Sequence, residues 1–226
     1  MYPRLETESQ YERWSENKRF RDAPEGFPFQ GYNRVLDRIV QASGARPEEG
    51  VLELGIGTGI LARRFLERAC RVVGMDDCPE RLAEARRKHP GLMLHRSDMR
   101  KHWPRFQTPI HHVVAAYSLH ELTLGAKLMV VRRALDLLPP QGRVLIGDVA
   151  FPSRSARLAA SLRYRDRWNH NEHYWAADET ADYFGDLGIT SSFEPITPCS
   201  GLLIFVRALD REHDGGGGAF EASLPQ

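Results

Sequence analysis

The segment Val51–Ile60 constrains the fold of this chain more than any other stretch of its sequence. It reads Val-Leu-Glu-Leu-Gly-Ile-Gly-Thr-Gly-Ile, an apolar run with one carboxylate followed by glycines at alternate positions. The apolar run predicts a short buried strand, and Leu61, Phe65 and Leu66 then recur at helical spacing. Glycines between a strand and a helix let a ligand approach the backbone, and the helix N-terminus beyond them offers free N–H groups. The segment therefore predicts a pocket for a nucleotide.

The spacing of the glycines narrows the kind of nucleotide. A dinucleotide site requires G-x-G-x-x-G, whose third glycine permits close packing of the helix on the strand. Counted from the first two glycines, that third position holds the branched Ile60. The pattern present is E-x-G-x-G-x-G, formed by Glu53, Gly55, Gly57 and Gly59. It resembles the first motif of the class I S-adenosylmethionine-dependent methyltransferases, in which the loop wraps the amino-acid end of the cofactor.

Two acidic motifs follow the glycines in the order that this resemblance implies. Asp76 and Asp77 end the second apolar run, about 20 residues after the glycines, where a carboxylate can accept both ribose hydroxyls. We predict that Asp76 makes these bonds; Asp77 replaces it if the strand runs one residue longer, and the structural alternative for Asp76 is a helix N-cap. The resemblance implies that Asp98 accepts from the adenine amino group and that the backbone N–H of Met99 meets a ring nitrogen.

The segment after the fourth apolar run is predicted to hold the reacting centre. Ile110–Ala116 is rich in Val and Ala, as a strand covered on both faces should be. Ligands of open α/β sheets bind at the carboxyl ends of the strands where their order reverses, so Tyr117 and His120 should face the cofactor's methyl group. His120 is the candidate general base, because an ordinary pKa of about 6.5 suits proton transfer at neutral pH. The alternative for His120 is an orienting hydrogen bond or packing of the next helix.

The apolar runs together predict a doubly wound α/β sheet with helices on both faces. Seven strands are expected, over Val51–Leu54, Cys70–Met75, Leu92–His95, Ile110–Ala116, Arg143–Val149, Ile189–Ile196 and Gly201–Ala208. The first five alternate with helices, which implies parallel right-handed crossovers and places the fourth strand beside the first. The short connection between the last two strands forces a hairpin, so the last strand should be antiparallel. The resemblance covers residues 30–208 and implies the same Rossmann-like fold.

The chain is predicted to have three parts. Residues 1–30 are an N-terminal lid segment, residues 31–208 the methyltransferase domain, and residues 209–226 a flexible glycine-rich tail. Trp14 matches a Trp found in the lid of some small-molecule members, among them uncharacterised bacterial enzymes. The Tyr usually found four residues later is replaced by Lys18, so Trp14 either contributes to the substrate pocket or anchors the lid.

A substrate-side insert is predicted over residues 151–176. Its aromatic and polar mixture suits a small-ligand pocket, and we predict that His173 and Tyr174 contribute to it. The alternative is structural, with Tyr174 anchoring the following helix and the histidine solvated. His170, Glu172 and His173 are too crowded for a zinc site, so no metal is expected.

Composition excludes several classes of partner. The net charge of +1 gives no overall attraction to nucleic acid or to an anionic membrane, and no run approaches the length of a membrane span. Three unpatterned cysteines suit reduced thiols in the cytoplasm. Pro198-Cys-Ser-Gly201 copies the nucleophile motif of RNA cytosine-5 methyltransferases, but Cys199 lies in the last hairpin and not after the fourth strand.

Three functions are consistent with these patterns. The first is a methyltransferase that uses S-adenosylmethionine and modifies O, N or S of a small molecule. The second is a non-catalytic cofactor-binding protein on the same fold, because a fold does not fix a function. The third is a nicotinamide-dependent oxidoreductase, which Ile60 and the lack of a Tyr-x-x-x-Lys motif disfavour. The sequence identifies neither the acceptor nor the oligomeric state.

Overall fold

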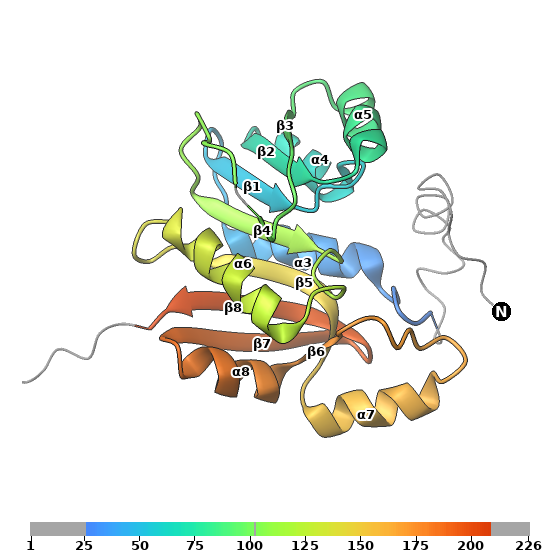
Figure 1. Ribbon diagram of the computed structural model, residues 1–226. Helices are drawn as coiled ribbons and strands as arrows, with labels where there is room; N and C mark the ends of the chain where they lie inside the picture. The colour runs from blue at the N-terminus through green and yellow to red at the C-terminus, as the bar shows by residue number, and fades with distance from the viewer. Residues whose placement is uncertain (1–25, 102, 209–226) are drawn as a thin grey trace, which may run out of the picture.

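Seven strands form a continuous sheet in the computed structural model, which describes residues 26–101 and 103–208. They are β1 (Gly50–Leu54), β2 (Arg71–Asp76), β3 (Met93–Arg96), β4 (His112–Ala116), β5 (Val144–Phe151), β7 (Ile189–Thr197) and β8 (Ser200–Arg207). Their order is β3-β2-β1-β4-β5-β8-β7, and β8 runs antiparallel to both of its neighbours (Figure 1). The predicted doubly wound sheet with an antiparallel last strand is confirmed.

Helices cover both faces of this sheet. They are α3 (Tyr32–Ser43), α4 (Ile60–Leu66), α5 (Pro79–Lys88), α6 (Leu124–Asp136), α7 (Arg154–Arg163) and α8 (Ala177–Gly185). Side chains alternate across a strand, so Val51 packs in one buried cluster with α3, α4 and α5 while Leu52 packs in another with α6 and α8. Figure 1 shows this division, with α6 and α8 in front of the sheet and α3 behind it.

The segment between β5 and α8 contains structure that the sequence analysis did not predict. It holds α7 and a two-residue strand, β6 (Trp175–Ala176), which pairs in parallel with the end of β5. The helix begins at Ser153, whose side chain accepts from the backbone N–H of Ala156. Only Ala160 of α7 is fully buried, and Leu158 and Leu162 are exposed. The apolar residues of α7 therefore do not form one buried face. Helices are predicted from such a face, so the sequence did not indicate α7.

The strand order reverses between β1 and β4. The strand β1 pairs in parallel with β2 on one side and with β4 on the other. The loops that leave β1 and β4 consequently meet, and the Ser118 hydroxyl donates to the backbone carbonyl of Leu54 at 2.7 Å. In the described part of the chain, no helix has the length and apolar character needed to cross a membrane.

Candidate active site

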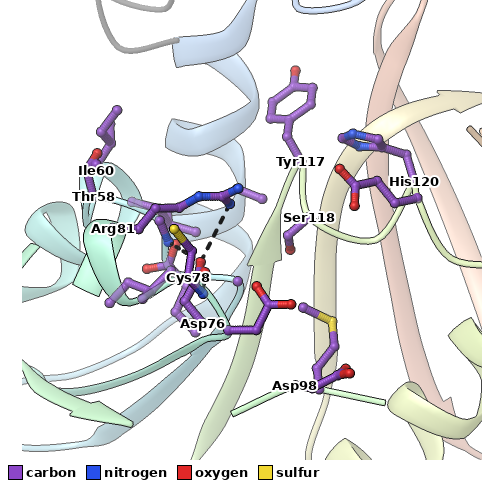
Figure 2. Close-up of a pocket in the computed structure, with 18 of the residues that line it drawn as sticks. Thr58, Ile60, Asp76, Cys78, Arg81, Asp98, Tyr117, Ser118 and His120 are labelled. Atoms are coloured by element: carbon purple, nitrogen blue, oxygen red, sulfur yellow. Dashed lines mark hydrogen bonds and ion pairs between the residues drawn. The ribbon is translucent and has the colours of Figure 1, made fainter. Parts of the chain in front are cut away.

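A cavity of about 810 Å³ opens where the strand order reverses. Its walls come from the glycine loop after β1, the ends of β2 and β3, and the segment after β4 (Figure 2). Phe29 and Tyr32 add aromatic surface from the start of α3. The predicted site residues that line the cavity are Glu53, Gly55, Gly57, Asp76, Asp98, Met99, Tyr117 and His120.

The glycine loop has a backbone that only glycine adopts easily. Gly55, Gly57 and Gly59 have φ angles of 68°, 55° and 86°, in the left-handed region. A Cβ on Gly55 would lie 2.4 Å from the Cβ of Ser118. Gly59 is not among the residues that line the cavity, and a Cβ there would meet the ring of His89 at 2.9 Å. Gly55 and Gly57 thus shape the cavity wall, whereas Gly59 permits close packing behind the loop.

Glu53 places a buried carboxyl group at the base of the loop. It is 2% exposed, and it accepts a hydrogen bond from the backbone N–H of Ala62 in the first turns of α4. Its Oε2 atom is buried and has no hydrogen-bond partner among the described residues. Burial raises the pKa of Glu53 well above its ordinary value, and the neighbouring charge of Asp76 adds to this rise. The cavity therefore has an unsatisfied acceptor beside its glycine loop.

Asp76 occupies the last position of β2 and ties the glycine loop to that strand. Its Oδ2 accepts from the backbone N–H of Gly57 at 2.9 Å, and its Oδ1 accepts from that of Cys78 at 2.9 Å. Arg81 approaches the same carboxylate at 3.8 Å (Figure 2). Asp77, the alternative, is exposed and lies beyond the end of the strand. Asp76 thus has a structural task in addition to the predicted contact with ribose.

Asp98 and Met99 follow β3 and face the cavity from the adjoining wall. The Asp98 carboxylate accepts two hydrogen bonds from the Arg100 side chain, at 2.9 and 2.8 Å. These bonds lower the pKa of Asp98 to about 2. The Met99 carbonyl accepts from the Trp103 indole at 2.7 Å. The adenine-binding role of both residues stays a prediction.

Tyr117 leaves β4 in a strained conformation. Its φ angle is 50°, a rare value for a bulky residue, which costs on the order of 1–3 kcal/mol and is typical of functional sites. The ring stacks on Tyr32, with centroids 5.1 Å apart, and meets Phe29 edge-on at 5.1 Å. Burial raises the pKa of its hydroxyl well above the ordinary range. The strain turns the chain so that the next residues run along the cavity.

His120 lies in this turn, three residues after Tyr117, and is 7% exposed. Its Nδ1 atom lies 2.7 Å from Oδ1 of Asp148, and its Nε2 atom lies 4.0 Å from Oε2 of Glu172. Because Nδ1 donates to Asp148, Nε2 is the nitrogen that can accept a proton. The imidazole is the one basic side chain among the described residues lining the wall formed by the segment after β4 (Figure 2).

The insert residues lie behind His120 and do not line the cavity. His173 is exposed, and its backbone N–H donates to the carbonyl of His120 at 2.6 Å. Tyr174 is 3% exposed and packs against Phe27 and Trp168, with ring centroids 5.7 and 4.7 Å away. Trp14 lies outside the described residues. The substrate roles predicted for these three residues stay predictions.

Two charged residues beside His120 were missed by the sequence analysis. Asp148 has no exposed surface, and Lys127 is 1% exposed. The sequence could have indicated a role for Asp148, because it is the single carboxylate inside Val144–Phe151, a strand that is otherwise apolar. The signal for Lys127 is weaker, because a lysine in an amphipathic helix is normally solvated.

Known proteins share this fold and part of this sequence. A protein-family profile described as "Methyltransferase domain" matches residues 51–142. An uncharacterized methyltransferase of Geobacillus kaustophilus is 28% identical over 196 residues, which cover 81% of this chain and 88% of that protein.

Two solved structures extend the comparison of folds. Magnesium protoporphyrin IX methyltransferase from Synechocystis PCC 6803, crystallised with bound SAH, has a TM-score of 0.64 at 15% identity and covers 90% of this chain and 96% of its own. A chain from the Haloferax volcanii complex of the Trm112 methyltransferase activator with a methyltransferase also has a TM-score of 0.64, at 14% identity, covering 89% of this chain and 95% of that one.

The fold and the cavity define an α/β protein of the doubly wound class with a ligand site at the reversal of strand order. The sequence matches add a reaction, because the matched family and the matched relatives are methyltransferases. The match of residues 51–142 to a methyltransferase domain, the methyltransferase relatives and the fold of the solved neighbours all support the class I S-adenosylmethionine-dependent methyltransferase family that the glycine motif resembles.

Proposed function

We propose that this protein transfers a methyl group from S-adenosylmethionine to an oxygen, nitrogen or sulfur atom of a small metabolite. The observation that carries the proposal is that the glycine loop and His120 line the same cavity. A cofactor held by the loop and an acceptor beside His120 share one space, as a direct transfer between them requires.

The residues of the cavity fit the cofactor. A volume of about 810 Å³ lies within the range of small-molecule sites, about 300–1,000 Å³. The unpartnered Oε2 of Glu53 suits an ammonium group, because a buried acceptor without a partner gains most from a charged donor. Gly55 and Gly57 line the cavity without side chains, so a ligand can contact the backbone of the loop there. Asp76 and Asp98 are the proposed partners of the ribose and of the adenine.

The chain contributes alignment, exclusion of water and a proton acceptor. The bound cofactor supplies an electrophilic methyl group on a sulfonium. Holding two reactants in line contributes about 7–11 kcal/mol in well-oriented cases. Nε2 of His120 takes the proton of the acceptor, while its Nδ1 stays hydrogen-bonded to Asp148.

Two observations support an acceptor of metabolite size. The cavity wall near His120 is aromatic, with the rings of Phe29 and Tyr32 both in contact with that of Tyr117, and flat apolar walls suit small ligands. The Synechocystis neighbour is named for a small-molecule substrate, magnesium protoporphyrin IX. We propose that Trp14, His173 and Tyr174 influence acceptor binding from outside the described cavity wall.

Calorimetry followed by an acceptor screen tests the proposal. The protein should bind S-adenosylmethionine and its demethylated product, and it should not bind NADH. A panel of hydroxyl, amine and thiol metabolites with methyl-labelled cofactor should then reveal a labelled product. Binding of NADH alone would overturn the cofactor assignment. Tight cofactor binding with no labelled product across the panel, and with label appearing in added protein or RNA, would overturn the substrate class.

A further inference from the structure

Asp148 is a fully buried carboxylate next to the proposed base. Its Oδ1 lies 2.7 Å from Nδ1 of His120 and accepts from the backbone N–H of Val149 at 2.8 Å. Its Oδ2 accepts from the backbone N–H of Leu119 at 3.2 Å and from the indole N–H of Trp175 at 3.3 Å. Donors on both oxygens stabilise the charged form of a carboxyl group that burial alone would neutralise. Asp148 is therefore an anion held in a fixed orientation.

Lys127 is a second buried base near Asp148, and both side chains contact Trp175. Its Nζ atom lies 4.1 Å from the centre of the Trp175 ring and donates to the backbone carbonyl of His173. Burial lowers the pKa of Lys127 to about 7, although Asp148 acts in the opposite direction. Burial raises the pKa of Asp148, but attraction to His120 and Lys127 outweighs it and leaves that pKa below its ordinary value. The Asp148 carboxylate thus interacts electrostatically with two basic side chains, those of His120 and Lys127.

His120 is the member of this cluster that lines the cavity. The titratable groups around it are Asp148 from β5, Lys127 from α6, Glu172 and Tyr174 from the segment that precedes β6, and the adjacent Glu121. Burial lowers the pKa of His120, but the charges of Asp148, Glu172 and Glu121 outweigh it and leave the pKa above its ordinary value. Asp148 is the only one of these carboxylates, among the described residues, within hydrogen-bond distance of the ring.

We propose that Asp148 and Lys127 are positioning residues for His120: Asp148 fixes the ring through Nδ1 and stabilises its protonated form, and Lys127 balances the charge of Asp148. The inference rests on the proposed function, because it assigns His120 the acceptor's proton. In that step the proton moves to Nε2, the electron pair of the acceptor forms the new bond to the methyl group, and the pair of the broken S–C bond stays on sulfur. Asp148 offsets the positive charge that His120 gains.

The test is an NMR titration of the full-length protein with ring-¹⁵N-labelled histidine, without cofactor. Loss of one signal in His120→Gln identifies His120. The nitrogen shifts should show a neutral form protonated at Nδ1. Asp148→Asn should lower the pKa of His120, because the stabilising charge is removed. Lys127→Met should raise it, because Asp148 then acts on His120 alone.

Two further variants serve as controls for this titration. Asp136→Asn removes an exposed α6 carboxylate paired with Arg207 and should leave the His120 titration unchanged. If Asp148→Asn does not fold, the double variant Asp148→Asn/Lys127→Met removes both buried charges, and its His120 pKa should lie below that of Lys127→Met. A His120 pKa that is equal in the wild type and Lys127→Met, or that moves the same way in Lys127→Met and Asp148→Asn, would overturn the inference.

Cofactor binding separates this inference from the proposed function. Failure of the wild type to bind S-adenosylmethionine refutes the proposed function, while the cofactor-free titration still tests the roles of Asp148 and Lys127. With an acceptor from the screen, Asp148→Asn should lower kcat by about 10²–10⁴-fold and leave the KM for S-adenosylmethionine unchanged. An unchanged kcat would overturn the positioning role of Asp148.

Discussion

Replacing Gly55 by alanine tests the glycine loop most directly. The φ angle of 68° costs an L residue about 1–2 kcal/mol. The new Cβ would also lie 2.4 Å from the Cβ and 2.8 Å from the Oγ of Ser118, and that serine cannot move without breaking its bond to the Leu54 carbonyl. Overpacking of this kind costs about 1–3 kcal/mol. Gly55→Ala should therefore lower the free energy of unfolding by about 2–5 kcal/mol in total.

Two other glycines separate these contributions. Gly188 has a φ angle of 74° and nothing within 4 Å of its Cβ position, so Gly188→Ala should lower the free energy of unfolding by only about 1–2 kcal/mol. Gly91 has open space and no positive φ, so Gly91→Ala should change it by less than about 1 kcal/mol. Urea denaturation measures all three. Calorimetry with S-adenosylmethionine should show lost affinity for Gly55→Ala alone. Equal unfolding free energies for Gly55→Ala and Gly188→Ala would refute the close approach of the two loops, and unchanged affinity would refute the pocket.

Three further predictions concern the acids and the base of the cavity. Asp76→Ala removes the acceptor of the Gly57 and Cys78 backbone N–H groups, so urea denaturation should show a loss of about 3–6 kcal/mol in addition to weaker cofactor binding; full stability would contradict these bonds. Glu53 has a pKa raised by burial, so its contribution is complete below its unfolded pKa and is lost as pH rises through the folded one. Glu53→Gln cannot titrate, and its stability relative to the wild type should rise as the pH increases above the unfolded pKa of about 4.3; a difference that stays constant with pH would show that Glu53 does not have this raised pKa. S-adenosylmethionine carries a sulfonium charge that its demethylated product lacks, so calorimetry in two buffers near neutral pH should detect additional proton release from His120 for the former only. Equal release for both ligands, or the same difference in His120→Gln, would contradict a site beside the sulfonium.

The strands were predictable because a buried strand is composed mainly of apolar residues, which can be seen in the sequence. Runs such as Val51–Leu54 and Ile110–Ala116 are mostly apolar, as strands covered on both faces are, and the short connection before Gly201 allowed only a hairpin. The position of Asp76 in the cavity wall was predictable because the carboxyl ends of parallel strands meet at one edge of the sheet, while its contact with ribose stays a prediction. By contrast, α7 buries almost nothing, so periodicity carried no information about it.

The partners of His120 were not predictable, because they depend on which segments meet in space. Asp148 and Lys127 lie 28 and 7 positions away from His120 in the chain, on a strand and a helix, and only the packed sheet brings the three side chains into one cluster. The hydrogen bonds that the backbone N–H and carbonyl of His173 make to His120 and Lys127 were also not predicted. Residue type gives no warning of such backbone contacts.

The backbone of His173 has a consequence for how enzymes of this shape can acquire new substrates. Its N–H donates to the carbonyl of His120 and its carbonyl accepts from the ammonium group of Lys127, so the segment between β5 and α8 is hydrogen-bonded to the proposed base and to the buried lysine. Under the proposed function, exchange of this segment for one from a relative should therefore affect two properties together, acceptor binding and the position of His120. A graft that keeps the chain path from Glu172 to Trp175 should preserve transfer while the rest of the segment diverges, which makes these four residues the boundary at which selectivity can be re-engineered independently of rate.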